Sequence, residues 1–537
     1  MWLACTMLFS VMLGHAGCFL NAKVEPYYGR VVVPRAQEFR WSDGGLPQTF
    51  DPAYAAAPPD TDLVRAIFEG LTDYDPKTLK AVPGVAARWE PSNGGRTWTF
   101  YLRPNARWTN GETVTAADFV RSWNRTVKIG ELSPHTELLS NIDGAAEAVS
   151  ESVLRVQLRR PDLNFPALVA HPVFRPVKLK NGEEIGKLAA AGLVSNGAFS
   201  LAQGETERVL LERANNYWDR DQVTLERVEF IDQKNAEAAL DGYYNGTIDA
   251  VTNAALEPLA IKLLTPYEDF RRTTYGALTY YTFNKGREPF DDVRVREALA
   301  LAIDRDRISS DDMHGATEPA KRFLPDAVSE APKTVVGKSD LLEQDVLRAK
   351  ELLAEAGFPD GEGFPPIRLL INRNEQQRTV AQAVAGMWRR VLNVETEIIV
   401  KNWDEYESAI REGDFDVVRR GVVIQTTDEL TNINMIFHNH GAAATDLSRQ
   451  KNGGDPLARN ERAIAPHESG QPVGPETEAQ ALSELAAMPI YFAASYALVK
   501  PYVTGFDSNV LDAPSLKTVR INPDWKPAES PGSGTKK

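Results

Sequence analysis

The segment from Gly94 to Trp123 constrains the fold more than any other stretch of this chain. In its first half, three apolar residues alternate with Thr and Tyr: Trp98, Phe100 and Leu102. This period of two predicts a half-buried strand. A turn is predicted at 109–111 (Thr-Asn-Gly), and Thr115 and Asp118 then have the spacing of a capping box at a helix start. The segment therefore predicts a strand, a turn and a capped helix.

The second half of the chain shows a different pattern. A helix is predicted from Val293, with Asp291 or Asp292 as its cap. Strands and helices are then predicted to alternate over 367–371, 380–391, 394–400, 403–411 and 415–424. This β-α-β-α-β order predicts a partly parallel sheet covered by helices. We interpret the Met and Trp side chains of the 380–391 stripe as core.

Charge and cysteine content exclude several classes of protein. The formal net charge of −14 argues against a general nucleic-acid binder, which needs a basic surface. Cys5 and Cys18 are the only cysteines, so no intramolecular disulfide is expected once a leader is removed. Beyond the N-terminus, no apolar run reaches the ~18 residues of a membrane-spanning helix.

Several blocks of the chain resemble one known family. The 94–123 segment is similar to the signature of extracytoplasmic solute-binding proteins of family 5, which serve oligopeptide and dipeptide ABC importers. Further similar blocks follow in the family's order: Phe-Glu-Gly-Leu at 68–71, Ser-Asn-Gly-Ala-Phe at 195–199, Asn-Tyr-Trp-Asp at 216–219, Asn-Gly-Thr-Ile-Asp at 245–249 and Tyr-Tyr-Thr-Phe-Asn at 280–284. The resemblance covers roughly residues 38 to 440 and resumes at 488–502.

The resemblance implies an α/β (mixed α+β) chain with a two-lobed, type II-like periplasmic-binding-protein fold and an extra N-terminal subdomain. We expect lobe I at 34–280 plus 491–525, with the subdomain inserted at about 60–187, and lobe II at 281–490. Two strands, at 279–284 and 490–496, should cross between the lobes. We expect a loop at 441–477, where relatives carry a long helix, and a disordered tail at 526–537.

The N-terminus predicts export. Residues 3–13 are apolar, and Ala16-Gly17-Cys18 resembles the end of a bacterial lipoprotein signal, although no Lys or Arg precedes the run and His15 departs from the pattern. We expect a signal peptide at 1–18, lipidation of Cys18 and a place in the periplasm or on the cell envelope. The alternatives are plain cleavage nearby or an uncleaved anchor.

In this family an extended ligand lies between the lobes and pairs its main chain with a strand edge. The corresponding strand here is 416–425. The resemblance places the following residues at or near the ligand: Ala56, Pro58, Tyr275, Trp403, Arg419, Gly421, Val422 and Val423. Arg419 is expected to hold a ligand carboxylate or to form an interlobe ion pair. Tyr275 and Trp403 have packing as an equal alternative.

The strand departs from the family pattern. Peptide-binding relatives show Gly-Trp-x-x-Asp-Tyr where this chain has Gly421, Val422, two aliphatic residues, Gln425 and Thr. The missing Asp pairs with the peptide's α-ammonium, and losing a buried charge partner costs about 2–5 kcal/mol, or roughly 30- to 4,000-fold in affinity. Asp428 or its neighbour Glu429 would replace that carboxylate only if the loop bends back; otherwise both are exposed loop acids.

The function expected is therefore binding without catalysis. The chain has no nucleophile elbow, no zinc-protease motif and no complete phosphate loop, and His438 with His440 has only His467 as a further zinc ligand. We expect no cofactor, a monomer, a peptide-like ligand, and permease subunits as partners, with membrane attachment only through Cys18. The alternatives are a non-peptide or N-blocked ligand, and a surface sensor or chaperone uncoupled from transport.

Overall fold

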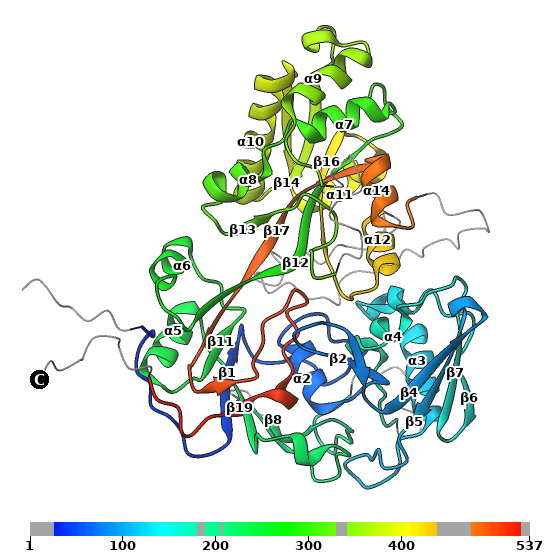
Figure 1. Ribbon diagram of the computed structural model, residues 1–537, viewed down its shortest axis with the longest axis vertical. Coiled ribbons are helices and arrows are strands. Elements are labelled where there is room, and N and C mark those ends of the chain that lie inside the picture. Colours follow the sequence, from blue (N-terminus) through cyan, green and yellow to red (C-terminus); the bar gives the residue numbers. More distant parts are fainter. Residues whose placement is uncertain (1–25, 180–187, 205–207, 329–340, 438–473, 528–537) are drawn as a thin grey trace, which may run out of the picture.

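Two long strands connect the two lobes of the molecule. The computed structural model describes residues 26–179, 188–204, 208–328, 341–437 and 474–527. Strands β12 (Phe270–Phe283) and β17 (Ala487–Val499) lie antiparallel and connect a lower lobe to an upper one (Figure 1). The predicted leader with Cys18, the zinc candidates, most of the 441–477 loop and the end of the tail lie outside the described residues.

One mixed sheet of eleven strands runs through both lobes. Its path is β15 (Thr396–Lys401), β14 (Ile367–Asn372), β16 (Val417–Val423), β12, β17, β11 (Ala250–Thr252), β1 (Glu38–Asp43), β10 (Arg227–Ile231), β9 (Arg208–Arg213) and β8 (Phe199–Gly204). Strand β13 (Thr317–Pro319) also pairs with β17. Strand β14 is parallel to β15 and β16, and β1 is parallel to β10 and β11.

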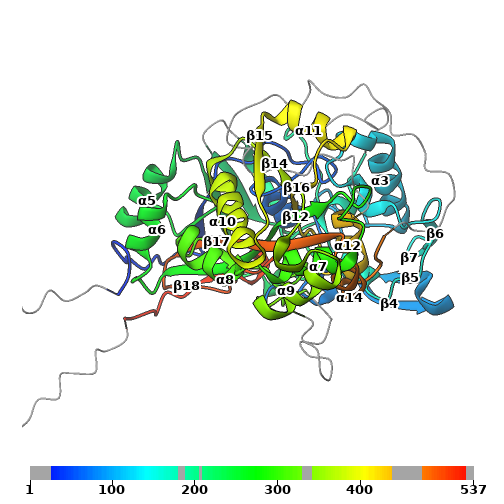
Figure 2. The same cartoon turned by 90° about the horizontal axis from the view of Figure 1, so that it is seen from above.

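The upper lobe confirms the predicted alternation of strands and helices. Its helices are α7 (Val293–Leu301), α8 (Arg305–Arg307), α9 (Val346–Glu355), α10 (Glu375–Leu392), α11 (Trp403–Glu412), α12 (Glu429–Phe437) and α14 (Glu478–Glu484). Asp292 caps α7, since its carboxylate accepts the Arg294 N–H at 2.8 Å. Seen from above, α7, α9 and α10 lie on one side of β14–β16 and α11 on the other (Figure 2). Trp388 of α10 is fully buried, as the core interpretation requires.

The lower lobe contains the strand, turn and capped helix predicted from the 94–123 segment. They form β5 (Thr97–Leu102) and α3 (Ala116–Ile129), and both hydrogen bonds of the Thr115–Asp118 capping box are present. Strand β5 belongs to a four-stranded sheet with β4 (Ala86–Ser92), β7 (Val153–Gln157) and β6 (Glu147–Ser150). The remaining elements are α2 (Asp60–Ile67), β2 (Thr72–Tyr74), β3 (Ala81–Pro83), α4 (Phe165–Leu168), α5 (Ala236–Asn245), α6 (Pro258–Leu264), β18 (Val503–Thr504) and β19 (Arg520–Ile521).

The crossing strands are longer than the sequence predicts. Strand β12 begins at Phe270 rather than at 279, and β17 extends the predicted 490–496 at both ends. The sequence does not predict the start of β12, because apolar and polar residues do not alternate over Arg271, Arg272 and Thr273. The lobe boundaries and the limits of the subdomain stay predictions. One hydrophobic cluster, from Phe39 to Ile521, joins the four-stranded sheet to the rest of the lower lobe.

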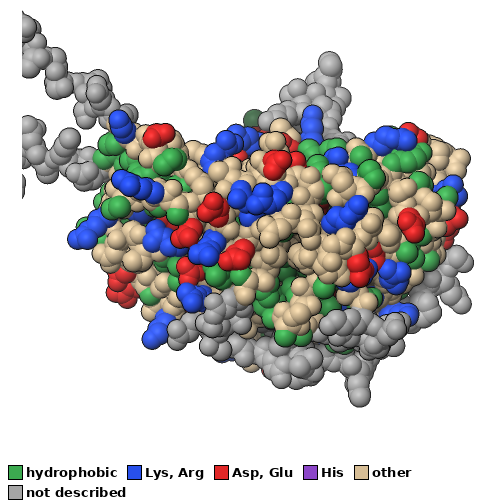
Figure 3. Space-filling model, turned by 90° about the horizontal axis from the view of Figure 1, so that it is seen from below, with side chains coloured by type: hydrophobic (Ala, Val, Ile, Leu, Met, Phe, Trp, Pro, Cys, Tyr) green, Lys and Arg blue, Asp and Glu red, His purple; other side chains and the backbone are tan. Residues whose placement is uncertain are grey.

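One face of the molecule carries side chains of both charges (Figure 3). On the face seen from below, basic and acidic side chains are interspersed with apolar ones (Figure 3). Within the described ranges, none of the helices combines the length and the apolar composition needed to cross a bilayer.

Candidate functional site

Strand β16 has one side that is only partly paired. Strand β14 pairs with β16 at Val417 and Val418 alone, whereas β12 pairs with it along its whole length. Beyond Val418, no described strand lies against the β14 side of β16. Residues 419–423 therefore present a strand edge to which another extended chain can add.

The pairing with β12 shows which backbone groups face this edge. The Ile424 N–H donates to the Gly276 carbonyl of β12 at 2.8 Å. Since backbone groups of alternate residues in an antiparallel strand point to opposite sides, those of Arg419, Gly421 and Val423 face away from β12. The Arg419 carbonyl already accepts the Tyr406 hydroxyl. The peptide groups of Gly421 and Val423 remain for an incoming chain.

This edge borders a cleft between the lobes with a volume of about 610 Å³. The cleft is lined by β12, β16, β17 and α11, by the start of α10, and by Ala254, Leu256 and Ile261 of the lower lobe. Five predicted site residues line it: Trp403, Arg419, Gly421, Val422 and Val423. Sequence reasoning missed Tyr406 and Tyr491, although Tyr406 follows Trp403 by three positions and so shares its helical face.

Arg419 lies along the same face of β16 as Gly421. A Cβ atom at Gly421 would come within 3.1 Å of the Arg419 guanidinium, so a side chain there would displace it. The Nε of Arg419 is buried and has no hydrogen-bond partner among the described residues. Those residues also offer Arg419 no carboxylate within ion-pair distance, which favours the ligand-carboxylate hypothesis over the interlobe ion pair.

Gln425 lies outside the cleft lining, at a contact between the lobes. Its Oε1 accepts a hydrogen bond of 3.4 Å from Nε2 of His171, whose Nδ1 accepts the Val173 N–H. Burial drives the pKa of His171 well below its usual value and lowers that of the neighbouring His135 to about 4, so both imidazoles are neutral near pH 7.

The segment that carries Ala56 and Pro58 also lies beside this contact rather than along the cleft. The Ala56 carbonyl accepts a hydrogen bond of 2.8 Å from Nε2 of His135. His135 and His171 meet edge to face, with ring centroids 4.8 Å apart. Ala56 and Pro58, which the resemblance places near the ligand, are therefore not among the residues that line the cleft, and Ala56 contacts His135 instead.

Asp428 does not reach the cleft either. It is 2% exposed, its carboxylate accepts the Thr431 N–H at 2.7 Å at the start of α12, and it faces Asp162 of the lower lobe. Glu429 accepts the Glu478 N–H at 2.7 Å. Neither acid is exposed, so the expectation of two exposed loop acids is wrong; both accept backbone N–H groups. The geometry does not support either as a replacement anchor.

Asp162 and Asp428 form a carboxyl pair across the lobes. Burial, followed by the charge of Asp428, raises the pKa of Asp162 to about 8. Because this lies above the unfolded-state value of about 3.9, the native chain keeps a proton that the unfolded chain loses, and Asp162 lowers stability progressively from about pH 4 to pH 8.

Asp162→Asn is therefore expected to stabilise the protein at pH 8 by roughly 1.5–3 kcal/mol, the range for a hydrogen bond to a charged group, and to have little effect at pH 4. Urea unfolding at the two pH values measures this. Asp143→Asn, at an exposed position, is the matched control. A variant no more stable than the parent at pH 8 would show that the pair holds no extra proton.

Tyr275 lies where the ladder between β12 and β17 is interrupted, and it is not part of the cleft lining. Burial raises its pKa, and the charges of Asp512 and Asp62 act on it. With Asp43, these carboxyls form a buried acid cluster at the carboxyl end of β1. Burial raises the pKa of all three acids, that of Asp512 to about 6.

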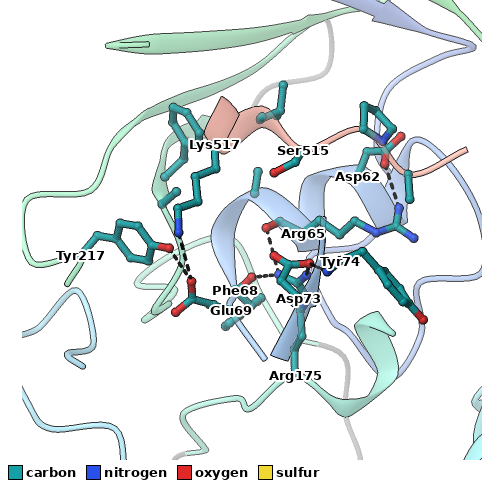
Figure 4. Close-up of a pocket in the computed structure, with 16 residues that line it drawn as sticks. Asp62, Arg65, Phe68, Glu69, Asp73, Tyr74, Arg175, Tyr217, Ser515 and Lys517 are labelled. Carbon is teal, nitrogen blue, oxygen red and sulfur yellow. Dashed lines mark hydrogen bonds and ion pairs between the residues drawn. The ribbon is translucent and has the colours of Figure 1, made fainter. Parts of the chain in front are cut away.

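A second cavity, within the lower lobe, is too small for a peptide. Its volume is about 30 Å³, enough for one or two water molecules (Figure 4). Its charged side chains pair with one another: Arg175 contacts Asp73 at 3.2 Å, and Lys517 lies 4.0 Å from Glu69. In the described ranges, no three His, Cys, Asp or Glu side chains gather as a metal site requires.

Comparison with known families identifies the architecture. The model of bacterial extracellular solute-binding proteins, family 5, matches residues 80–444. This chain belongs to that family. The two-lobed fold with crossing strands, expected from the resemblance, is thereby confirmed for this solute-binding protein.

Individual relatives agree along nearly the whole chain. The periplasmic murein peptide-binding protein MppA of Escherichia coli is 32% identical over 486 residues, covering 86% of this chain and 89% of that protein. The periplasmic oligopeptide-binding protein OppA of Salmonella typhimurium is 30% identical over 488 residues, covering 87% and 89%.

Two solved structures show the same fold. The unliganded open form of MppA superimposes with a TM-score of 0.74 at 28% identity, over 91% of this chain and 98% of that chain. Haemophilus influenzae OppA in complex with the peptide RPPGFSPFR gives a TM-score of 0.61 at 25% identity, over 91% and 100%. The solute-binding protein described here thus shares its architecture with both a ligand-free and a peptide-bound relative.

Proposed function

We propose that this protein is the extracytoplasmic receptor of a peptide-type ABC importer. It binds an extended, peptide-like ligand between its lobes and delivers that ligand to the permease subunits in the membrane. The observation that carries this proposal is the unpaired edge of β16, with the peptide groups of Gly421 and Val423 facing a cleft of about 610 Å³. The names of its relatives, which bind murein peptides and oligopeptides, support the same class of ligand.

Binding at this edge makes no covalent bond. An added strand gains main-chain hydrogen bonds irrespective of its side chains, so the receptor needs neither a catalytic group nor a cofactor. Ligand binding favours a closed arrangement, in which the lobes rotate about β12 and β17. The protein acts as a monomer, and Arg419 holds a ligand carboxylate in a forked geometry.

Position 425, where the resemblance implies an Asp that pairs with a peptide's α-ammonium, offers no carboxylate. Gln425 is neutral, and its side-chain oxygen accepts a hydrogen bond from His171, so it provides no counter-charge there. A receptor without that carboxylate is expected to favour an N-blocked peptide, or a ligand without an amino terminus, over a free peptide.

A thermal-shift screen tests the proposal. The purified chain is heated with free peptides, with their N-acetylated counterparts, and with oligosaccharides. A ligand at 100 times its dissociation constant adds about 2.7 kcal/mol, which raises Tm measurably. We expect the largest shift with N-acetylated peptides. A response only to oligosaccharides would overturn the peptide class, and no response to any pool would favour a sensor or chaperone role.

We also propose that Cys18 is lipidated after removal of residues 1–17, which would hold the receptor at the membrane surface next to its permease. The small residues before Cys18 support this. Mass spectrometry of the mature N-terminus tests it: a diacylglyceryl-modified Cys18 is expected, and an unmodified Cys18 would contradict the anchor.

A further inference from the structure

The ligand cleft is lined by more basic than acidic side chains. Three lining side chains carry a formal charge at neutral pH: Glu407, Arg419 and Arg420. Among the described residues, neither arginine lies within 4.0 Å of a carboxylate, and Glu407 acts on Arg420 only from a greater distance. The cleft wall therefore carries excess positive charge.

Arg420 is held in place but keeps hydrogen-bonding capacity. Arg420 is half-buried and is the cross-strand partner of Tyr280, whose hydroxyl donates to the Ile436 carbonyl at 3.1 Å. A planar guanidinium carries five N–H donors, so a contact with the Tyr280 side chain leaves most of them for another acceptor. Arg420 is thus a positioned cation at the cleft wall, adjacent in sequence to the unsatisfied Nε of Arg419.

The acids near the cleft do not balance this charge. Position 425 carries an amide rather than a carboxylate, and Asp428 faces Asp162 across the lobes. The acid cluster of Asp43, Asp62 and Asp512 is buried in the lower lobe. Its carboxyls hydrogen-bond to Thr252, Asn253 and Ser495 rather than facing the ligand.

We propose that Arg420 is a specificity-determining residue which, with Arg419, makes this cleft select peptide-like ligands that carry an acidic group in addition to their terminal carboxylate. This inference rests on the proposed function. An acidic side chain of the ligand would replace water at Arg420 with a charge-assisted hydrogen bond in a partly desolvated site. A Lys or Arg at the same position of the ligand would meet like charge and be excluded.

Titration calorimetry with N-acetylated tripeptides tests this. The peptides are Ac-Ala-Ala-Ala and its variants with Glu, Gln or Lys at each position in turn. At one position we expect Glu to bind about tenfold or more tightly than Gln, and Lys to bind more weakly than Gln. In Arg420→Gln the preference for Glu should disappear, while the Gln peptide keeps its affinity. Arg420→Lys, which retains the charge, should keep part of the preference.

Arg390→Gln is the matched control, because it removes the same charge from an exposed position on α10, outside the cleft. A thermal melt of each variant checks that the contact with Tyr280 is not needed for folding. Equal affinity for Glu, Gln and Lys peptides would overturn the inference and leave the proposed function intact. A preference for Glu that survives Arg420→Gln would remove Arg420 from this role. Failure of every peptide to bind would overturn the proposed function as well.

Discussion

Replacing Val423 by proline is expected to weaken ligand binding by roughly 5- to 150-fold without unfolding the protein, because a ligand carbonyl loses its donor. The Val423 N–H faces the open edge of β16, whereas the next N–H, of Ile424, bonds to β12. Proline is tolerated in a strand when its missing N–H would have faced away from the sheet. The substitution therefore removes a hydrogen bond to the ligand and none from the ladder.

Calorimetry with the tightest-binding N-acetylated tripeptide measures the loss. Val423→Ala, which keeps the N–H, should bind within about threefold of the parent, since it removes only two methyl groups at a half-buried position. Val422→Pro should instead destabilise the fold, because its N–H belongs to the β12 ladder. Unchanged affinity in Val423→Pro would mean that the ligand does not add to this edge.

Arg125→Met is expected to destabilise the protein by about 3–5 kcal/mol, because it leaves the Asp51 carboxylate buried without its counter-charge. The two side chains are 2% and 0% exposed, and the pair has two hydrogen bonds, one of 3.0 Å. Asp51 also accepts the backbone N–H groups of Ala53 and Leu188, both at 3.1 Å. Losing the arginine should therefore loosen the segment that leads to Ala56.

Urea unfolding of the variant measures this cost. The double variant Asp51→Asn/Arg125→Met should be more stable than Arg125→Met alone, since Asn leaves no buried charge and its Oδ1 can still accept one of the two backbone N–H groups. Arg88→Met is the control: its pair with Glu90 is more than half exposed, so its loss should cost no more than about 1 kcal/mol. If Arg125→Met lowered the free energy of unfolding as little as Arg88→Met, the buried Asp51 carboxylate would not depend on Arg125 for its stability.

The local elements were predictable because each rests on nearby residues. The capping box of α3 needs only Thr115 and Asp118, and the alternation around Trp98 needs only its neighbours. The contact between the lobes at Gln425 was not predictable in this way. Gln425 meets His171 across 254 positions, and no local pattern in either segment indicates the pairing.

In the candidate site, too, some features could be predicted from the sequence, whereas others depend on contacts distant in sequence. The resemblance located Trp403, Arg419 and Gly421 at the cleft because they lie on elements whose order it fixed. The sequence alone leaves Asp428 open as a replacement anchor or an exposed loop acid; in the structure it is buried, and its carboxylate accepts the Thr431 N–H at the start of α12. The open edge of β16 depends on where β14 stops pairing, which is a property of the whole sheet.

The position of β17 in the middle of the shared sheet has a consequence for how the chain folds. This strand comes from the last tenth of the sequence, yet it lies between β12 and β11, and Val499, Tyr502, Leu516 and Ile521 complete the core of the lower lobe. The N-terminal residues of the lower lobe therefore cannot complete their core until the C-terminal residues have been synthesised. With so many contacts distant in sequence, folding should be slow, and a chain truncated before residue 487 should fail to form either lobe.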